Sequence, residues 1–262
     1  MIKVKFKEVN YWTSKIVPWI IPILILLAWI VFTEIGDIST KIFPKPGKVL
    51  ESFIKLAKDG ELLDNIIISA ERALSGFIVG GGIGFILGFI NGLSRKAETL
   101  LDSTIQMIRN IPHLALIPLV ILWFGIGPQA KLLLISLGVF FPIYLNTFHG
   151  IRSIDTQLIE MGKVYGLKGF PLFKEVILPG ALPSILVGVK QSLGIMWLTL
   201  IVAETVAADS GIGYMAMNAR ELMLMDIIVL SIIVYALLGK LSDVIAKLLE
   251  HRLLRWHPNF KK

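Results

Sequence analysis

The chain has 262 residues, of which 55% are hydrophobic and only 17% are charged, with a formal net charge of +7. A soluble domain of this size carries more charge, so the composition excludes that class. The sequence contains no cysteine, which excludes disulfides, thiolate metal sites and cysteine catalysis. Lys and Arg lie in the tails and between apolar runs, as is typical of membrane topology signals and not of nucleic-acid binding.

The apolar residues cluster in runs of about 20, long enough to cross about 30 Å of hydrocarbon. Such runs are expected to be helices, because a helix satisfies its own backbone hydrogen bonds without water. The sequence therefore predicts an all-α polytopic membrane protein with six transmembrane helices. We expect a membrane domain over 16–250, between a cytoplasmic tail at 1–15 and a basic cytoplasmic tail at 251–262.

The first apolar run, 16–32, predicts a retained membrane helix, because no small-residue cleavage site follows it. Tryptophans near its ends are candidates for interfacial anchoring: Trp12, Trp19 and Trp29. Residues 34–64 are predicted to form a polar external segment. From Lys48 to Ala57 apolar residues recur at helical spacing, which predicts an amphipathic helix on the outer membrane surface or against the bundle.

A second helix is predicted over 65–93, and its glycines fall four residues apart throughout. Small residues at this spacing let a neighbouring helix approach closely. Each step of four turns about 40° past a full turn, so the stripe winds around the helix and is predicted to serve more than one neighbour. The helix-packing glycines are Gly76, Gly80, Gly84, Gly88 and Gly92.

Four further apolar helices are expected, at 106–124, 131–149, 184–207 and 227–249. The first of these is interrupted by Pro112 and Pro118. Residues 208–226 are predicted to form an outer segment that is partly re-entrant, since Gly211 and Gly213 break regular structure.

Between the fourth and fifth helices lies a polar loop, 151–180, whose main part is the stretch 160–179. Its pattern predicts a helix, a turn at Gly166 and Gly169, and a second helix that begins at Pro171 and stops before Pro179. One interpretation is an ordinary solvated loop. A loop of this length with its own helices is uncommon, however, unless something docks on it.

This stretch resembles the EAA loop of ABC-importer permeases in the spacing of Glu160, Gly166 and the residues 176–179. It departs at the two alanines after the glutamate, which are Met161 and Gly162 here. The resemblance covers about 18–257. Within that family the chain is most similar to the permeases for aliphatic sulfonates, with the taurine and nitrate permeases as relatives, on the stretches 106–119 and 197–205.

The resemblance implies a type I ABC importer fold in the bacterial inner membrane, with both termini cytoplasmic. It implies a second permease copy as a homodimer partner, two ABC ATPase subunits and an external substrate-binding protein. It implies no cofactor on this chain, with ATP and magnesium bound by the ATPase, and Glu160 and Gly166 would shape the coupling loop. The loop's other expected functional residues are Leu167, Lys168, Phe170, Pro171, Phe173 and Pro179.

The chain lacks a nucleotide-hydrolysing motif of its own. Gly239-Lys240 has Val234 where a P-loop needs its first glycine and Leu241 where it needs Ser or Thr. The four histidines show no metal-ligand spacing. We therefore expect a non-catalytic transport subunit, with no catalytic or metal-binding residues.

Polar residues inside the third helix indicate a translocation path. Arg109 and His113 are four residues apart on one face, with Asn110 beside them. A cationic, donor-rich face could hold an anionic headgroup, because guanidinium pairs well with oxyanions. The alternative is that Arg109 lies about one turn inside the cytoplasmic end and extends to the membrane surface.

Trp197, Thr199 and Glu204 are path candidates on the fifth helix. Trp197 could form an apolar wall for an alkyl tail or pack between helices. Glu204 would repel an anion, so we expect it to gate the path or to pair with a basic residue such as Lys131 or Arg220. Three alternatives stay open: a permease for taurine, nitrate or another small solute, an ion-gradient-driven secondary transporter, and a non-transporting scaffold.

Overall fold

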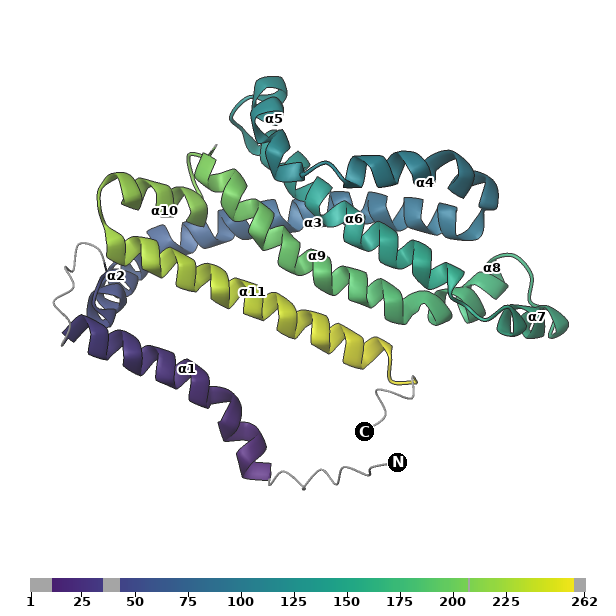
Figure 1. Cartoon of the computed structure of the whole chain (residues 1–262), viewed down its shortest axis with the longest axis horizontal. Helices are drawn as coiled ribbons and strands as arrows, with labels where there is room; N and C mark the ends of the chain where they lie inside the picture. The colour runs from purple at the N-terminus through teal and green to yellow at the C-terminus, as the bar shows by residue number, and fades with distance from the viewer. Residues whose placement is uncertain (1–10, 35–42, 207, 257–262) are drawn as a thin grey trace.

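The computed structural model describes residues 11–34, 43–206 and 208–256, and these ranges are helical without a β-strand (Figure 1). The expectation of an all-α chain is confirmed over them. The first half contains α1 (Tyr11–Glu34), α2 (Pro46–Lys58), α3 (Glu61–Leu93), α4 (Arg95–Arg109), the 3-10 helix η1 (His113–Leu116), α5 (Ile117–Phe124) and α6 (Pro128–Arg152). The second half contains α7 (Thr156–Val164), α8 (Phe170–Leu172), the π-helical η2 (Phe173–Ile177), α9 (Leu178–Val206), α10 (Ile212–Glu221) and α11 (Met225–Leu253).

Among the described residues, four helical stretches are long and apolar enough to cross a membrane: α3, α6, the run Phe170–Val206, and α11. A fifth is the pair formed by α4 and the segment His113–Phe124, which passes as one span bent by 78°. The apolar part described in α1, Trp19–Glu34, is shorter. These helices account for four or five of the six membrane spans that the sequence predicts.

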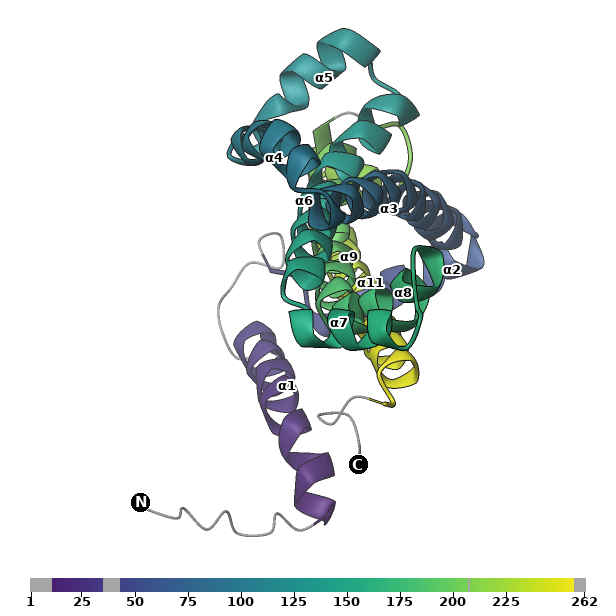
Figure 2. The ribbon, with the colours of Figure 1, turned by 90° about the vertical axis from the view of Figure 1, so that its right-hand side faces the viewer.

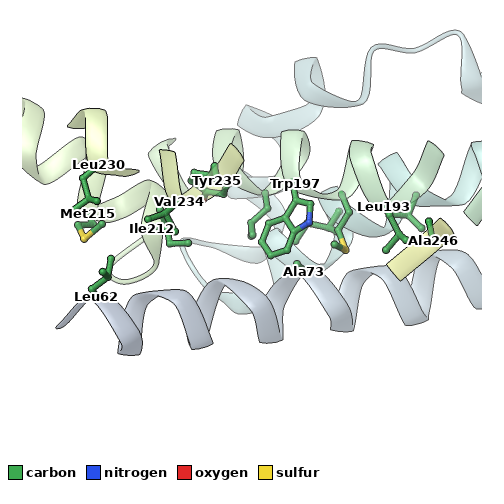
Figure 3. Close-up of a cluster of buried hydrophobic side chains, with 14 of the residues drawn as sticks. Leu62, Ala73, Leu193, Trp197, Ile212, Met215, Leu230, Val234, Tyr235 and Ala246 are labelled. Carbon is green, nitrogen blue, oxygen red and sulfur yellow. The ribbon is translucent and has the colours of Figure 1, made fainter. Parts of the chain in front are cut away.

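The helices α3, α6, α9 and α11 lie side by side and form the body of the bundle (Figures 1 and 2). Their largest core cluster joins Ala73 of α3, Trp197 of α9 and Tyr235 of α11 (Figure 3). Most of α1 stands apart from this bundle. Most of the apolar side chains described between Val17 and Phe32 are exposed, as expected of a helix that faces hydrocarbon.

The predicted amphipathic helix is α2, and it packs on the bundle. Val49 and Leu56 are buried in the main core cluster. The Ser52 hydroxyl donates a hydrogen bond to Asp226 in the first turn of α11. Of the two positions left open for this segment, the structure therefore has it against the bundle.

The glycine stripe of α3 faces one neighbour, α6, along its whole length. A Cβ at Gly76 would lie 2.5 Å from Ile135, and one at Gly84 would lie 2.6 Å from the carbonyl oxygen of Phe140. A Cβ would also come too close to α6 at the other three glycines: at Gly80 to Ser136, at Gly88 to Tyr144, and at Gly92 to Ile151. The prediction of several neighbours is wrong, because the two helices wind around each other and the contact line follows the stripe.

The predicted third helix is broken into α4 and α5. Ser94 caps the start of α4 by accepting a hydrogen bond from the Ala97 N–H at 3.3 Å. The break follows from Pro112, which has no N–H and disfavours helical backbone at Ile111. Because α4 begins at Arg95, Arg109 lies about 20 Å along the axis of that helix, in its last turn.

The predicted stop before Pro179 is also wrong. The chain runs helically from Phe170 to Val206, so the fifth helix begins before residue 184. The turn before Pro179 is π-helical, with the Leu178 N–H bonded to the Phe173 carbonyl. Pro179 follows this π-helical turn as the second residue of α9, and the proline has no N–H with which to continue the regular hydrogen-bond pattern.

Candidate coupling hairpin and translocation site

The coupling hairpin, residues 156–177, opens with a capped helix and a tight turn. Asp155 caps α7 by accepting from the Gln157 N–H at 2.8 Å. At the other end the Leu167 N–H bonds to the Gly162 carbonyl, and the Gly166 N–H bonds to the Lys163 carbonyl, both at 3.0 Å. This is a Schellman motif, which needs left-handed backbone at Gly166, and the φ there is 84°.

The second arm of the hairpin packs closely on α7 through Gly162. A Cβ at Gly162 would lie 2.8 Å from the Cδ1 atom of Leu172, so the leucine side chain would have to shift to admit one. Phe173 anchors the arm to the bundle by an edge-to-face contact with Phe89 of α3, with ring centroids 4.7 Å apart. Gly162 is therefore a point of close contact between the two arms of the hairpin.

The tip of the hairpin presents apolar side chains to the outside. Val164 is 86% exposed, Tyr165 80% and Phe170 71%. The hairpin projects from one end of the bundle (Figure 1). Glu160, Lys168 and Pro171 are also exposed, while Leu167, Phe173 and Pro179 are half-buried. The prediction did not include Val164 and Tyr165, although two large apolar residues beside a turn glycine were a usable signal.

The break between α4 and α5 brings together three elements. The His113 ring Nε2 lies 3.2 Å from the Thr199 hydroxyl of α9. A Cβ at Gly138 of α6 would lie 2.8 Å from the same hydroxyl, so only glycine leaves room for this contact. The structure thus joins His113 and Thr199, two of the residues that the sequence predicts as path candidates.

Arg109 and Asn110 precede this break and are exposed. Arg109 has no ion pair among the described residues. Irregular backbone at membrane depth is tolerated where it is covered by protein or lines a water-filled cavity, not where it faces lipid. The exposed break is therefore a surface that needs protein or water against it.

Glu204 is buried, and hydrogen bonds reach both of its carboxylate oxygens. The Arg72 guanidinium lies 2.9 Å from Oε1. The Tyr235 hydroxyl at 2.9 Å and the Gly213 N–H at 3.0 Å donate to Oε2. The Ser69 hydroxyl lies within 2.9 Å of both oxygens. The expected partners Lys131 and Arg220 are wrong, because Arg72 on α3 is the residue that forms the ion pair.

The same network anchors the segment between α9 and α10. Arg72 also donates to the Ser210 carbonyl at 2.6 Å and to its hydroxyl at 2.7 Å. The Ile212 N–H donates to Ser69 at 2.9 Å. Outside the spans, the Ser210 hydroxyl donates to Asp209 and lowers the pKa of that carboxyl. The sequence signal for Arg72 is its charge within the apolar run of α3, because a charged residue there usually has a partner inside the bundle.

Trp197 lies in the core, on the side of α9 that faces α11 (Figure 3). Its indole N–H donates to the Ser242 hydroxyl at 2.8 Å, and its ring meets Tyr235 edge to face at 6.3 Å. The three path candidates predicted on α9 therefore lie in different surroundings. Thr199 meets the break, whereas Trp197 and Glu204 are held by contacts within the bundle.

A helical bundle with a broken span and an exposed hairpin is the architecture of a membrane permease subunit. Residues 80–255 match the family of binding-protein-dependent transport system inner membrane components. The chain belongs to this family, and it is a multi-pass inner-membrane component of a transport system. A chain of the MetNI methionine ABC transporter, solved in an inward-facing conformation, shares the fold with a TM-score of 0.52. That similarity has 21% sequence identity and covers 75% of this chain and 97% of the other.

Two curated relatives are much more similar in sequence. The Escherichia coli K12 protein named "Putative aliphatic sulfonates transport permease protein SsuC" is 58% identical over 96% of both chains. The Bacillus subtilis 168 protein of the same name is 43% identical over 92% of this chain and 88% of its own length.

Proposed function

We propose that this chain forms the translocation pathway of an ATP-driven importer for aliphatic sulfonates. The observation that carries this proposal is the 58% identity, over 96% of both chains, to a relative named for aliphatic sulfonate transport. The chemistry of the break agrees with an anionic solute. Arg109, Asn110 and His113 supply positive charge and hydrogen-bond donors, and guanidinium pairs well with oxyanions.

The coupling hairpin receives the motion of the ATPase. Its exposed apolar tip, which includes Phe170, is the kind of patch that marks a protein interface. Glu160 and Gly166 shape the hairpin, while Leu167, Lys168, Pro171 and Phe173 form the contact surface with Phe170. The second arm continues without interruption into α9, so a displacement of the hairpin moves a helix that reaches the break.

A second copy of the chain completes the pathway in this proposal. The break carries polar backbone and an unpaired Arg109 on the surface of one chain, which suits a water-filled path between two copies. Six spans place both termini on the cytoplasmic side, with α1 as the first span. An external binding protein delivers the solute, and a separate ATPase binds ATP and magnesium.

Uptake by the complete importer tests this function. The chain is reconstituted with its ATPase and binding protein, and uptake of ethanesulfonate, taurine and nitrate is measured with and without ATP. We expect ATP-dependent uptake, fastest for ethanesulfonate. Faster uptake of taurine or nitrate would contradict the assignment to aliphatic sulfonates and identify another solute. Uptake that persists without ATP and needs an ion gradient would contradict the ATP-driven mechanism.

A further inference from the structure

An apolar pocket of about 740 Å³ lies between the broken span and the bundle. Its walls come from α3, α4, α6 and the end of α5, and include Ile83, Ile108 and Leu137. Along α6 it extends from Gln129 to Phe141, which corresponds to about 18 Å of helix. The pocket is therefore long enough to suit an extended alkyl chain.

The lining of the pocket carries no charged side chain. Its polar residues are Gln129 and Ser136, and the Ser136 hydroxyl is already bonded to the Gly76 carbonyl at 3.2 Å. Arg109 follows Ile108 directly in α4 and has no ion pair in the described parts of the chain. Arg109 also lies one turn beyond Ile105, a lining residue, on the same face of α4, so an unneutralised guanidinium follows the apolar lining at this end of the pocket.

We propose that this pocket binds the alkyl chain of a linear alkanesulfonate while Arg109 holds the sulfonate group. The inference rests on the proposed function and adds a determinant of chain-length selectivity within the permease. The methylene groups gain by leaving water for an apolar wall, and the guanidinium matches the planar donor pattern that oxyanions accept. The wall for the alkyl tail is this pocket and not Trp197, which is held in the core.

The test fills the pocket and measures selectivity in the complete importer. Ile83→Trp narrows the slot, while Ile86→Trp places the same side chain about one turn away on α3, outside the pocket lining. The two isoleucines are matched in exposure, at 49% and 56%. Uptake of methanesulfonate and hexanesulfonate is measured with the same binding protein, so a change in their ratio reports the permease.

We expect Ile83→Trp to lower the ratio of hexanesulfonate to methanesulfonate uptake by about tenfold, as when roughly two methylene groups lose their apolar contacts. Ile86→Trp is expected to leave the ratio unchanged. Ile83→Ala widens the slot and keeps an apolar wall, so it is expected to raise the ratio of hexanesulfonate to methanesulfonate uptake. This variant tests the pocket assignment if the tryptophan variant does not fold.

An unchanged ratio in the Ile83 variants, with sulfonates still transported, would overturn the pocket assignment and leave the proposed function intact. Loss of co-purified phospholipid from Ile83→Trp at an unchanged ratio would identify a lipid site and also overturn it. If the wild-type importer transported no sulfonate although its ATPase was active, the proposed substrate would fail, and the pocket assignment with it.

Discussion

Glu204 shows at the scale of one residue why a carboxylate is tolerated inside this bundle. Its oxygens accept hydrogen bonds from donors on α3, α10 and α11, so no part of its charge is left unpaired. Gly211 completes the arrangement, because a Cβ there would collide with the Glu204 carboxylate and the backbone φ of 102° favours glycine. A buried ion pair of this kind holds a segment in place more than it adds net stability.

Removal of the Glu204 carboxylate should destabilise the protein strongly. Glu204→Ala removes the buried counter-ion of the mostly buried Arg72 guanidinium, which then keeps only the exposed Asp209 at 3.7 Å, and this costs about 3 kcal/mol. We expect a clearly lower midpoint of thermal unfolding in detergent, followed by tryptophan fluorescence. Asp243→Ala, which removes a surface ion pair with Lys247, is the control and should leave the midpoint nearly unchanged, because solvent screens exposed ion pairs. Equal losses in the two variants would contradict the buried role.

Glycine is required at position 166 by the backbone conformation and not by the packing of neighbouring atoms. Nothing lies within 4 Å of a Cβ built there, but the φ of 84° strains residues with side chains. Gly166→Val should cost about 1–2 kcal/mol in the turn and lower both ATPase co-purification and uptake. Gly166→Asn, which tolerates left-handed backbone, should keep most of both. Normal uptake by the valine variant would count against a coupling role for this turn.

At the scale of elements, α3 and α6 form the closest pair because five glycines remove side chains from one contact line. Small residues give helices van der Waals contact over their backbones, which is a main source of association where no hydrophobic effect operates. The next helix of the bundle packs on this pair, since α9 packs on α6 and also contacts α3.

Substitution within the stripe should separate these two helices. Gly80→Ala places a Cβ against the backbone of Ser136, which cannot move without shifting α6, at a cost of about 1–3 kcal/mol. Gly82→Ala is the matched control, because a Cβ at Gly82 has nothing within 4 Å. We expect a lower thermal midpoint for the first variant only. A similar midpoint for both would mean that the helices are not held at this distance.

At the scale of the whole molecule, the hairpin and the turn between α5 and α6 define opposite ends in the proposed topology. The absence of cysteine makes this testable, since one introduced thiol is the only one present. Tyr165→Cys at the hairpin tip and Ile126→Cys in the turn both replace exposed residues. An impermeant maleimide on intact spheroplasts should label only the Ile126→Cys variant, and inside-out vesicles should reverse this. Labelling of the hairpin from outside would overturn the coupling role.

The sequence by itself determined the all-helical class, the turn glycines of the hairpin and the close-packing stripe. These features depend on neighbouring residues: runs of apolar side chains, Gly166 after α7, and glycines one turn apart. The helical span of α2 followed from the same short-range pattern. The identity of the turn residues was predictable because left-handed backbone favours glycine wherever the helix around it ends.

Only the tertiary structure decided which residues meet across the chain. Arg72 and Glu204 are 132 positions apart, and either could have found another partner until the helices packed. His113 and Thr199 meet because Pro112 bends the span and Gly138 leaves space between them. Trp197 faces the core because of how α9 is rotated against α11. Such contacts depend on the rotation and crossing of whole helices, which no local pattern specifies.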